Sequence, residues 1–184
     1  MHHHGFHYSE NERRSRQNPE AILKSAGLKP GMCFIDSGCN DGFFTLPAAR
    51  IVGEAGKVFA IDIDKEALDR MKQKLTSENI DNVEIIHQPS EEVMLGENIA
   101  DIVFFGIVLH DFSDPLLVLK NSKQMLKPGG YIFNLDWQKK RSLYGPPYEK
   151  RFSHDHVRQL ADRSGLNASG YKEIGEDYYT VVLS

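Results

Sequence analysis

The chain has 184 residues, a length that fits one domain with a substantial core. Its formal net charge of -4 argues against a protein that binds nucleic acid through a broadly basic surface. No apolar run approaches the ~18–20 residues needed to span a bilayer, so we expect no membrane span. The two cysteines, Cys33 and Cys39, provide no disulfide framework and indicate a reduced protein in the cytoplasm.

The first 17 residues are polar, and we expect them to form an extension that precedes a single domain over residues 18–184. Four histidines stand among the first seven residues, but clustered histidines at a chain end bind metals weakly without a dedicated site, so no metal site is expected. The domain opens with a short helix. Asn18 is suited to cap it, Pro19 to occupy its first turn, and Gly27 to end it.

Apolar runs of strand length then alternate with amphipathic helices. The expected strands are residues 32–35, 57–61, 83–87, 99–107 and 131–135, and the expected helices are residues 43–52, 65–78 and 115–126. Strands that are apolar throughout are typical of a parallel sheet covered on both faces. Their alternation with helices over short connections predicts a doubly wound, Rossmann-like α/β fold.

The end of the chain has a different pattern. A helix over residues 153–163 is followed by strands over residues 168–174 and 178–183, joined by Gly175-Glu176-Asp177. Two strands with so short a connection form a hairpin, which adds an antiparallel edge to the parallel sheet.

The first strand leads into a helix through the turn Asp36-Ser37-Gly38-Cys39-Asn40-Asp41-Gly42. Gly38 permits a tight turn and the close approach of a ligand to the backbone, and Gly42 lets the helix pack near the strand. The free N–H groups at the start of the helix favour an anionic or polar ligand. A good turn without any ligand would also use these residues.

Asp62 ends the second strand, 20 residues after Gly42. An acid at this place accepts hydrogen bonds from ribose hydroxyls in dinucleotide and nucleoside binders. The alternative role is a helix cap, but Asp64 is better placed for it. The turn and the acid together predict a nucleoside cofactor.

Residues 34–62, together with residues 101–105 and Leu126-Lys127-Pro128-Gly129-Gly130, resemble the class I S-adenosylmethionine-dependent methyltransferases. The resemblance is strongest to the small type 11, quinone- and arsenite-methyltransferase-like group, and it extends from Asn18 to the C-terminus. It implies a seven-stranded, mostly parallel sheet of order 3-2-1-4-5-7-6 that ends in the hairpin. It also implies S-adenosylmethionine as the cofactor, S-adenosylhomocysteine as its product, and a small-molecule methyl acceptor.

The resemblance assigns the first turn to the methionine part of the cofactor, Asp62 to the ribose, and Ile63 and Ser90 to the adenine. The end of the fourth strand would form the pocket floor. The residues so implied are Asp36, Gly38, Cys39, Asn40, Gly42, Asp62, Ile63, Ser90, Phe105 and Gly106. The chain departs from the family twice: Asn40 replaces a glycine, and Pro89 stands where an acid often contacts the adenine.

His110 and Asp111 follow the fourth strand, at the edge where open α/β sheets bind ligands. His110 is the best candidate for a base and Asp111 accompanies it, although both residues also suit a loop cap. Trp137, Tyr144 and Tyr148 follow the fifth strand and are candidates for contacts with the acceptor. In related small enzymes the N-terminal segment closes over the cofactor, so residues 1–17 are a candidate lid.

The sequence therefore predicts an enzyme that transfers a methyl group from S-adenosylmethionine to a small molecule by direct displacement. Two alternatives stay open. A non-catalytic module that binds S-adenosylmethionine would share the cofactor residues and lack the acceptor side. A nicotinamide-dependent oxidoreductase would share the turn and Asp62, but its glycines stand closer together than Gly38 and Gly42.

Overall fold

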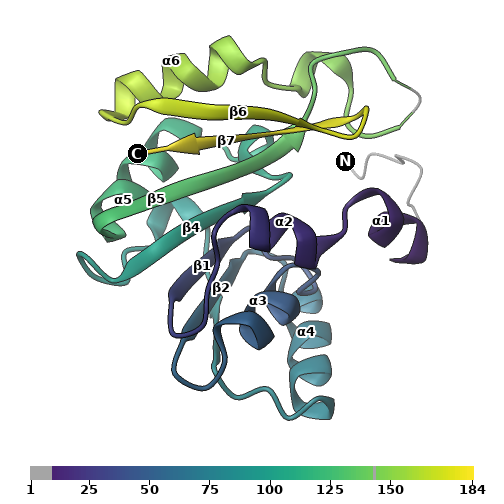
Figure 1. The fold of residues 1–184 in the computed structure, drawn as a ribbon, viewed down its shortest axis with the longest axis vertical. Helices are drawn as coiled ribbons and strands as arrows, with labels where there is room; N and C mark the ends of the chain where they lie inside the picture. Colours follow the sequence, from purple (N-terminus) through teal and green to yellow (C-terminus); the bar gives the residue numbers. More distant parts are fainter. Residues whose placement is uncertain (1–9, 143) are drawn as a thin grey trace.

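The computed structural model describes residues 10–142 and 144–184. A seven-stranded sheet runs through the molecule, with helices on both of its faces (Figure 1). The strands are β1 (Cys33–Ser37), β2 (Lys57–Asp62), β3 (Val83–His87), β4 (Ala100–Gly106), β5 (Leu126–Trp137), β6 (Ala168–Ile174) and β7 (Tyr178–Leu183). The helices are α1 (Glu10–Arg16), α2 (Pro19–Ser25), α3 (Thr45–Val52), α4 (Lys65–Ser77), α5 (Pro115–Met125) and α6 (His154–Ser164). Short 3-10 helices span Ser90–Glu92, Leu109–Asp111 and Tyr148–Lys150.

The strand order is β3-β2-β1-β4-β5-β7-β6, as the resemblance implied. Strand β1 pairs in parallel with both β2 and β4, so Asp36 stands beside Ala60 on one side and Phe104 on the other. Strand β7 is antiparallel to β5 and to β6. The prediction of a parallel sheet closed by an antiparallel hairpin is confirmed.

Helix starts follow the capping residues in the sequence. The side chains of Asn18, Asp64, Asp114 and Ser153 accept hydrogen bonds from backbone N–H groups in the first turns of α2, α4, α5 and α6. Each such cap contributes about 1 kcal/mol to helix stability. Asp64 therefore has the capping role, which leaves Asp62 for another one.

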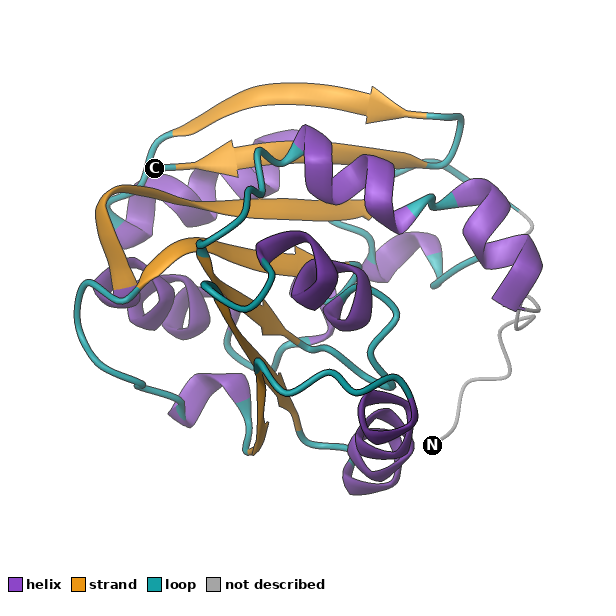
Figure 2. Ribbon diagram, turned by 60° about the horizontal axis from the view of Figure 1, so that its bottom comes forward, coloured by secondary structure: helices purple, strands orange, loops and turns teal. Residues whose placement is uncertain are grey.

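Helices cover both faces of the sheet (Figure 2). Each face buries its own apolar clusters. On one face, Phe34, Phe104 and Phe133 pack against α2 and α3, and helix α4 adds a third cluster beside them. On the other face, Phe105 and Val181 are among the strand residues that pack against α5 and α6. Alternate residues of β4 thus serve opposite layers, as a doubly covered parallel strand requires.

The fifth strand is longer than expected. The sequence predicts a strand over residues 131–135 after a stop at Lys127-Pro128-Gly129-Gly130, whereas β5 begins at Leu126, directly after α5. A break in register between Ala100 and Ile102 lets Leu126 pair with Ala100 before the regular pairing resumes at Tyr131. This irregularity accommodates Pro128, which has no N–H to donate to a strand partner.

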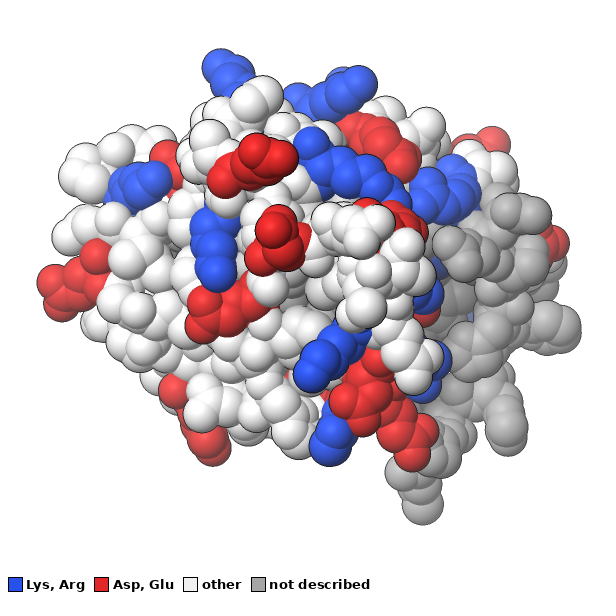
Figure 3. Space-filling model, turned by 90° about the horizontal axis from the view of Figure 1, so that it is seen from below, with Lys and Arg blue, Asp and Glu red and all other residues white. Residues whose placement is uncertain are grey.

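Residues 1–9, which hold the four clustered histidines and half of the candidate lid, lie outside the described residues. Within the described part of the chain, no helix has the length and apolar character needed to cross a membrane. Cationic and anionic side chains are interspersed on the face shown in Figure 3. Several of the charged residues on α3 and α4 form ion pairs, such as Lys65 with Asp69 and Arg50 with Glu78.

Candidate functional site

A cavity of ≈ 320 Å³ opens at the carboxyl edge of the sheet, among the loops that follow β1, β2, β3 and β4. Its lining residues are Gly38, Asp62, Ile63, Pro89, Ser90, Glu91, Val108, Asp111, Phe112 and Ser113. Four residues proposed from the sequence for the cofactor, Gly38, Asp62, Ile63 and Ser90, thus come together here. The strand order reverses between β1 and β4, and open α/β sheets form ligand sites at such a point.

The turn after β1 is held against β2. The N–H groups of Gly38 and Cys39 both donate to the carbonyl of Ile61, at 2.8 and 3.0 Å. Gly38 has φ +79°, and a Cβ added to it would lie 2.9 Å from Cβ of Val108, which lines the cavity. Asn40 has φ 48°, a left-handed conformation that asparagine tolerates better than most residues.

The carboxylate of Asp62 is fixed by two backbone groups. Its Oδ2 accepts from the N–H of Asn40 at 2.7 Å, and its Oδ1 accepts from the N–H of Asp64 at 2.9 Å. Each carboxylate oxygen retains a second lone-pair site. Asp62 therefore holds the β1 turn in place while keeping the capacity to accept hydrogen bonds from a ligand in the cavity.

Asp36 and Cys39 are buried beside this turn and do not line the cavity. Burial raises the pKa of Asp36 to about 7, although its Oδ2 accepts a 2.6 Å hydrogen bond from the Thr45 hydroxyl. Cys39 packs with Leu46 and Met71, and burial raises the pKa of its thiol. Such an uncharged, enclosed thiol is a packing group and not a nucleophile.

The other predicted cofactor residues do not line the cavity either. Gly42 lets α3 pack closely, since a Cβ there would lie 2.5 Å from Cδ1 of Leu46. Phe105 is fully buried and contacts Phe112, a cavity residue, at 5.6 Å between ring centroids. Gly106 ends β4, and the next residue, Ile107, has φ 64°. That conformation is strained for a β-branched residue, and such strain clusters at functional sites.

His110 lies in the loop after β4 and contacts the end of β5. Its Nδ1 is 2.7 Å from Oδ1 of Asp136, and neither side chain is more than 2% exposed. Its Nε2 lies 3.4 Å from Oδ2 of Asp111, the other predicted residue of this pair and a cavity residue. Burial alone would lower the pKa of His110, but the hydrogen bond and the charge of Asp136 outweigh it, so the pKa is raised.

The three aromatic residues predicted for the acceptor are placed differently from one another. Trp137 is 5% exposed, and its ring contacts Tyr178 at 4.5 Å between centroids and the Arg151 guanidinium at 5.0 Å. Tyr144 and Tyr148 are exposed on the loop after β5. Trp137 thus supports this loop from beneath, whereas the two tyrosines present their rings on its surface.

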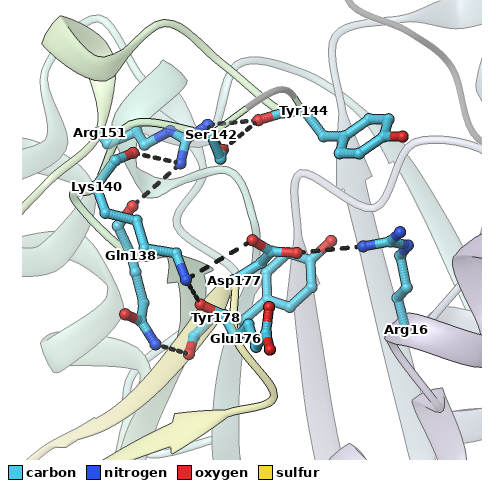
Figure 4. Close-up of polar contacts among 9 residues, drawn as sticks. All are labelled: Arg16, Gln138, Lys140, Ser142, Tyr144, Arg151, Glu176, Asp177 and Tyr178. Carbon is cyan, nitrogen blue, oxygen red and sulfur yellow. Dashed lines mark hydrogen bonds and ion pairs between the residues drawn. The ribbon is translucent and has the colours of Figure 1, made fainter.

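The guanidinium of Arg151 organises the loop of residues 138–150 (Figure 4). Arginine has five N–H donors, and here each has an acceptor within the loop. The acceptors are the carbonyls of Gln138, Lys140, Tyr144 and Pro146 and the hydroxyl of Ser142. Arg151 is 2% exposed, so one buried side chain determines the shape of the loop.

Replacing Arg151 with Lys is expected to open this loop, because an ammonium has three donors and cannot match the planar fork. We expect a loss of ~1–3 kcal/mol in unfolding free energy and faster proteolysis within residues 138–150. Urea denaturation and limited proteolysis measure the two effects. The matched control is Arg141→Lys, which changes an exposed cation of the same loop. Equal behaviour of the two variants would contradict the assigned role.

Helix α1 bridges the two halves of the carboxyl edge. The Arg13 guanidinium lies 3.9 Å from the centroid of the Phe43 ring, just after the β1 turn. Arg16 contacts the Tyr144 ring and pairs with Asp177 in the turn between β6 and β7, at 3.2 Å (Figure 4). These contact residues do not line the cavity, so the role of residues 1–17 as a lid stays a prediction.

Comparison with known proteins gives the family. A family model described as "Methyltransferase domain" matches residues 28–174 of this chain. The chain belongs to this family. Its members are class I S-adenosylmethionine-dependent methyltransferases, as the sequence motifs predicted.

Individual relatives agree with the family assignment. The chain is similar to a demethylmenaquinone methyltransferase of Staphylococcus aureus, with 32% identity over 115 residues, which are 62% of this chain and 47% of that protein. It thus spans about half the length of the curated relatives it matches. A crystal structure of an S-adenosylmethionine-dependent methyltransferase from Aquifex aeolicus superposes with a TM-score of 0.87, at 29% identity over 96% of this chain and 98% of that one. A Sulfolobus solfataricus protein assigned to type 11 methyltransferases gives a TM-score of 0.74 at 25% identity, covering 90% of each chain.

Several site residues are missing from the sequence-based prediction. Val108, Phe112 and Glu91 line the cavity without belonging to any recognisable motif. Asp136 is also missing from the predicted site residues, because its contact with His110 joins residues 26 positions apart. The adjacent ends of β4 and β5 were the signal that could have paired them.

Proposed function

We propose that this protein transfers a methyl group from S-adenosylmethionine to a small-molecule acceptor. The observation that carries the proposal is the cavity between the Gly38 turn and the loop after β4, which joins a fixed carboxylate, Asp62, to apolar walls. S-adenosylmethionine supplies an electrophilic methyl group on a sulfonium sulfur. The displacement is direct, so the protein contributes alignment, exclusion of water and, for a protonated acceptor, a base.

The residues present fit this cofactor. Asp62 retains lone pairs for ribose hydroxyls, and Ile63, 67% exposed, and Phe112 offer apolar surface to a planar base. Gly38 has no side chain of its own, and Val108, another cavity residue, packs against it. We assign the methionine part of the cofactor to this turn, with Asp36 beneath it. The side chains that line the cavity include acids and no cation, which suits a ligand with a positive sulfonium.

We assign the role of general base to His110. Since Asp136 is a buried acceptor, Nδ1 of His110 carries the proton and donates it to Oδ1. Nε2 is then left with a lone pair for the proton of an acceptor, and Asp136 stabilises the imidazolium that forms. A base of this kind is useful when the attacking atom is a hydroxyl oxygen or an acidic carbon.

The acceptor is accordingly proposed to be a small molecule that loses a proton as it is methylated. The relative from Staphylococcus aureus acts on demethylmenaquinone, according to its name. An aromatic acceptor would suit the exposed rings of Tyr144 and Tyr148, which stand on the loop over this edge. The buried His110–Asp136 pair favours catalysis over a binding module without chemistry, because such a module has no need for a base.

Two experiments test the function. Calorimetry with S-adenosylmethionine, S-adenosylhomocysteine and NADH separates a methyltransferase from a nicotinamide-dependent enzyme, and binding of NADH alone would overturn the proposal. A metabolite extract incubated with the protein and a labelled methyl donor then identifies the acceptor as the compound that acquires label. Loss of that labelling in His110→Gln is expected if His110 is the base.

Replacing Asp62 with Ala is expected to weaken the binding of S-adenosylhomocysteine by ~1–3 kcal/mol, the scale for hydrogen bonds to a charged group. The variant also loses the acceptor for the Asn40 N–H, so the β1 turn is held less firmly. Calorimetric titration measures the effect. Asp69→Ala, which removes an exposed carboxylate of α4, is the control. An affinity in Asp62→Ala equal to that of the control would show that the ribose assignment is wrong.

A further inference from the structure

We propose that Asn134 is a positioning residue for His110, acting through one buried water molecule that its amide shares with Asp136. This inference rests on the proposed function, because it gives Asn134 a part in holding the proposed base. Asn134 lies in β5, which runs between β4 and β7 (Figure 1), and it is fully buried. No motif in the sequence marks this residue.

The carboxylate of Asp136 is held through only one of its oxygens. Oδ1 lies 2.7 Å from Nδ1 of His110 and also accepts from the N–H of Trp137 at 2.8 Å. Oδ2 is buried and has no hydrogen-bond partner among the described residues. Buried polar atoms of folded proteins are nearly always hydrogen-bonded, either to protein groups or to ordered water. A partner for Oδ2 would also stop the carboxylate from turning and so would fix the direction of Oδ1.

Asn134 has the same deficit at a neighbouring position. Neither Nδ2 nor Oδ1 of its amide has a hydrogen-bond partner in the part of the chain that the structure describes. Asn134 and Asp136 are two residues apart on one strand, so their side chains stand on the same face, about 6.6 Å apart. Phe105 of β4 and Val181 of β7 pair with Asn134 on either side and have apolar side chains. The polar neighbour of Asn134 along this face is therefore Asp136.

Tyr179 supplies a third polar atom to this buried group. It pairs with Asp136 across β5 and β7, and its hydroxyl donates a long hydrogen bond of 3.4 Å to the carbonyl of Phe152. Burial raises the pKa of Tyr179 and the charge of Asp136 raises it further, while the side chain of Asn134 acts in the opposite direction. The three side chains are thus close enough to influence one another.

One water molecule matches the donors and acceptors of these groups. It can accept from Nδ2 of Asn134 and donate to Oδ2 of Asp136 and to the hydroxyl oxygen of Tyr179. Three such partners are typical of a buried water. A single water joins polar atoms about 5–6 Å apart, because each of its hydrogen bonds is about 2.8 Å long. This span suits two side chains that stand side by side on one strand.

The bridge has a consequence for the proposed base. When both oxygens of Asp136 are bonded, the plane of its carboxylate is fixed, and the ring of His110 is fixed through Nδ1. Nε2 then keeps its place 3.4 Å from Oδ2 of Asp111, a residue that lines the cavity. A displacement of a catalytic group by about 1 Å can cost ~100-fold in rate, even when its cause lies away from the reacting atoms.

A crystal structure of the wild-type protein tests the water directly. We expect a water peak within hydrogen-bond distance of both Nδ2 of Asn134 and Oδ2 of Asp136. The peak should be lost in Asn134→Leu, which keeps the branched shape of the side chain and removes its polar atoms. A wild-type structure in which no water contacts Oδ2 of Asp136 would overturn the inference.

The Nδ1 proton of His110 shows whether the water positions Asp136. A proton held in a fixed hydrogen bond to a carboxylate exchanges slowly and gives a downfield NMR signal. We expect this signal in the wild-type protein, its loss in Asn134→Leu, and its return in Asn134→Ser, whose hydroxyl leaves room for water. With the acceptor identified from labelling, kcat of Asn134→Leu should fall about tenfold to a hundredfold, and KM for S-adenosylmethionine should stay unchanged.

Thr180→Val is the matched control, because it removes a buried hydroxyl from β7 at a position that pairs with Leu135. This control should keep both the Nδ1 signal and kcat. If Asn134→Leu loses stability as Thr180→Val does and also keeps the signal, Asn134 only fills the core and the inference fails. Full labelling activity in His110→Gln would instead overturn the proposed base itself, whatever the crystal structure shows beside Asn134.

Discussion

Replacing Gly38 with Ala is expected to abolish useful cofactor binding, with a loss of about a hundredfold or more in affinity for S-adenosylhomocysteine. Two effects combine in this variant. The backbone at φ +79° is strained for any residue with a Cβ, and the new Cβ would lie 2.9 Å from Cβ of Val108. Relief of the clash displaces Val108 from the cavity wall. We expect the unfolding free energy to fall by ~2–4 kcal/mol.

A matched variant separates these two effects. Gly31 has φ +81°, but a Cβ added there has no heavy atom within 4 Å, so Gly31→Ala carries the backbone strain without the clash. We expect this control to lose ~1 kcal/mol of stability and to bind the cofactor normally. Calorimetric titration and urea denaturation of both variants provide the comparison. Normal binding by Gly38→Ala would place the cofactor away from this turn.

Replacing Asp136 with Asn is expected to lower kcat by about 10²–10⁴-fold with the acceptor identified from labelling. Asparagine can donate to Nδ1 and thereby favour the wrong tautomer, and it has no charge to stabilise the imidazolium. In the wild-type protein the pKa of His110 is raised by Asp136 against the effect of burial. Because the base must be neutral, activity should rise with pH through this raised pKa.

The pH dependence separates a role in catalysis from a role in folding. In Asp136→Asn the pKa of His110 should fall, so the acid limb of the activity profile should move to lower pH, and an NMR titration of the imidazole should show the same shift. The contribution of the charged pair to stability is present below the unfolded-state pKa of histidine and is lost as pH rises through the raised folded-state value. Asp111→Asn, which alters the exposed neighbour, should have a much smaller effect. An unchanged profile in Asp136→Asn would exclude His110 as the base.

The fold was largely predictable because its signals are local. Each strand is a short apolar run between turn residues, and the caps at Asn18 and Asp64 stand next to the helices they start. The beginning of β5 was not predictable, because Lys127-Pro128-Gly129-Gly130 has the local pattern of a break. Pairing with Ala100, a tertiary contact, keeps this segment in the sheet.

In the candidate site, too, the residues that could be predicted are those with a local sequence pattern. Gly38 and Asp62 were found because the turn and the strand end occur at a fixed spacing within one β-α-β unit. Glu91 accepts a hydrogen bond from Ser113, which is 22 residues away in the sequence. Asp136 contacts His110, which is 26 residues away. No local pattern encodes such a contact. The sequence therefore predicts the parts of the site that one segment builds, and the structure is needed for the parts that two segments share.

The cavity has a consequence for how the chain folds and unfolds. Its walls follow β1, β2, β3 and β4, and the central pairing joins Phe34 to Ile102 across most of the N-terminal half of the chain. The residues that line the cavity extend from Gly38 to Ser113, so a contiguous fragment must include all of residues 38–113 to contain them. Occupancy by a nucleoside would thus stabilise the assembled sheet as a whole by mass action. Nascent chains would gain this protection only after β4 has been synthesised and has docked against β1.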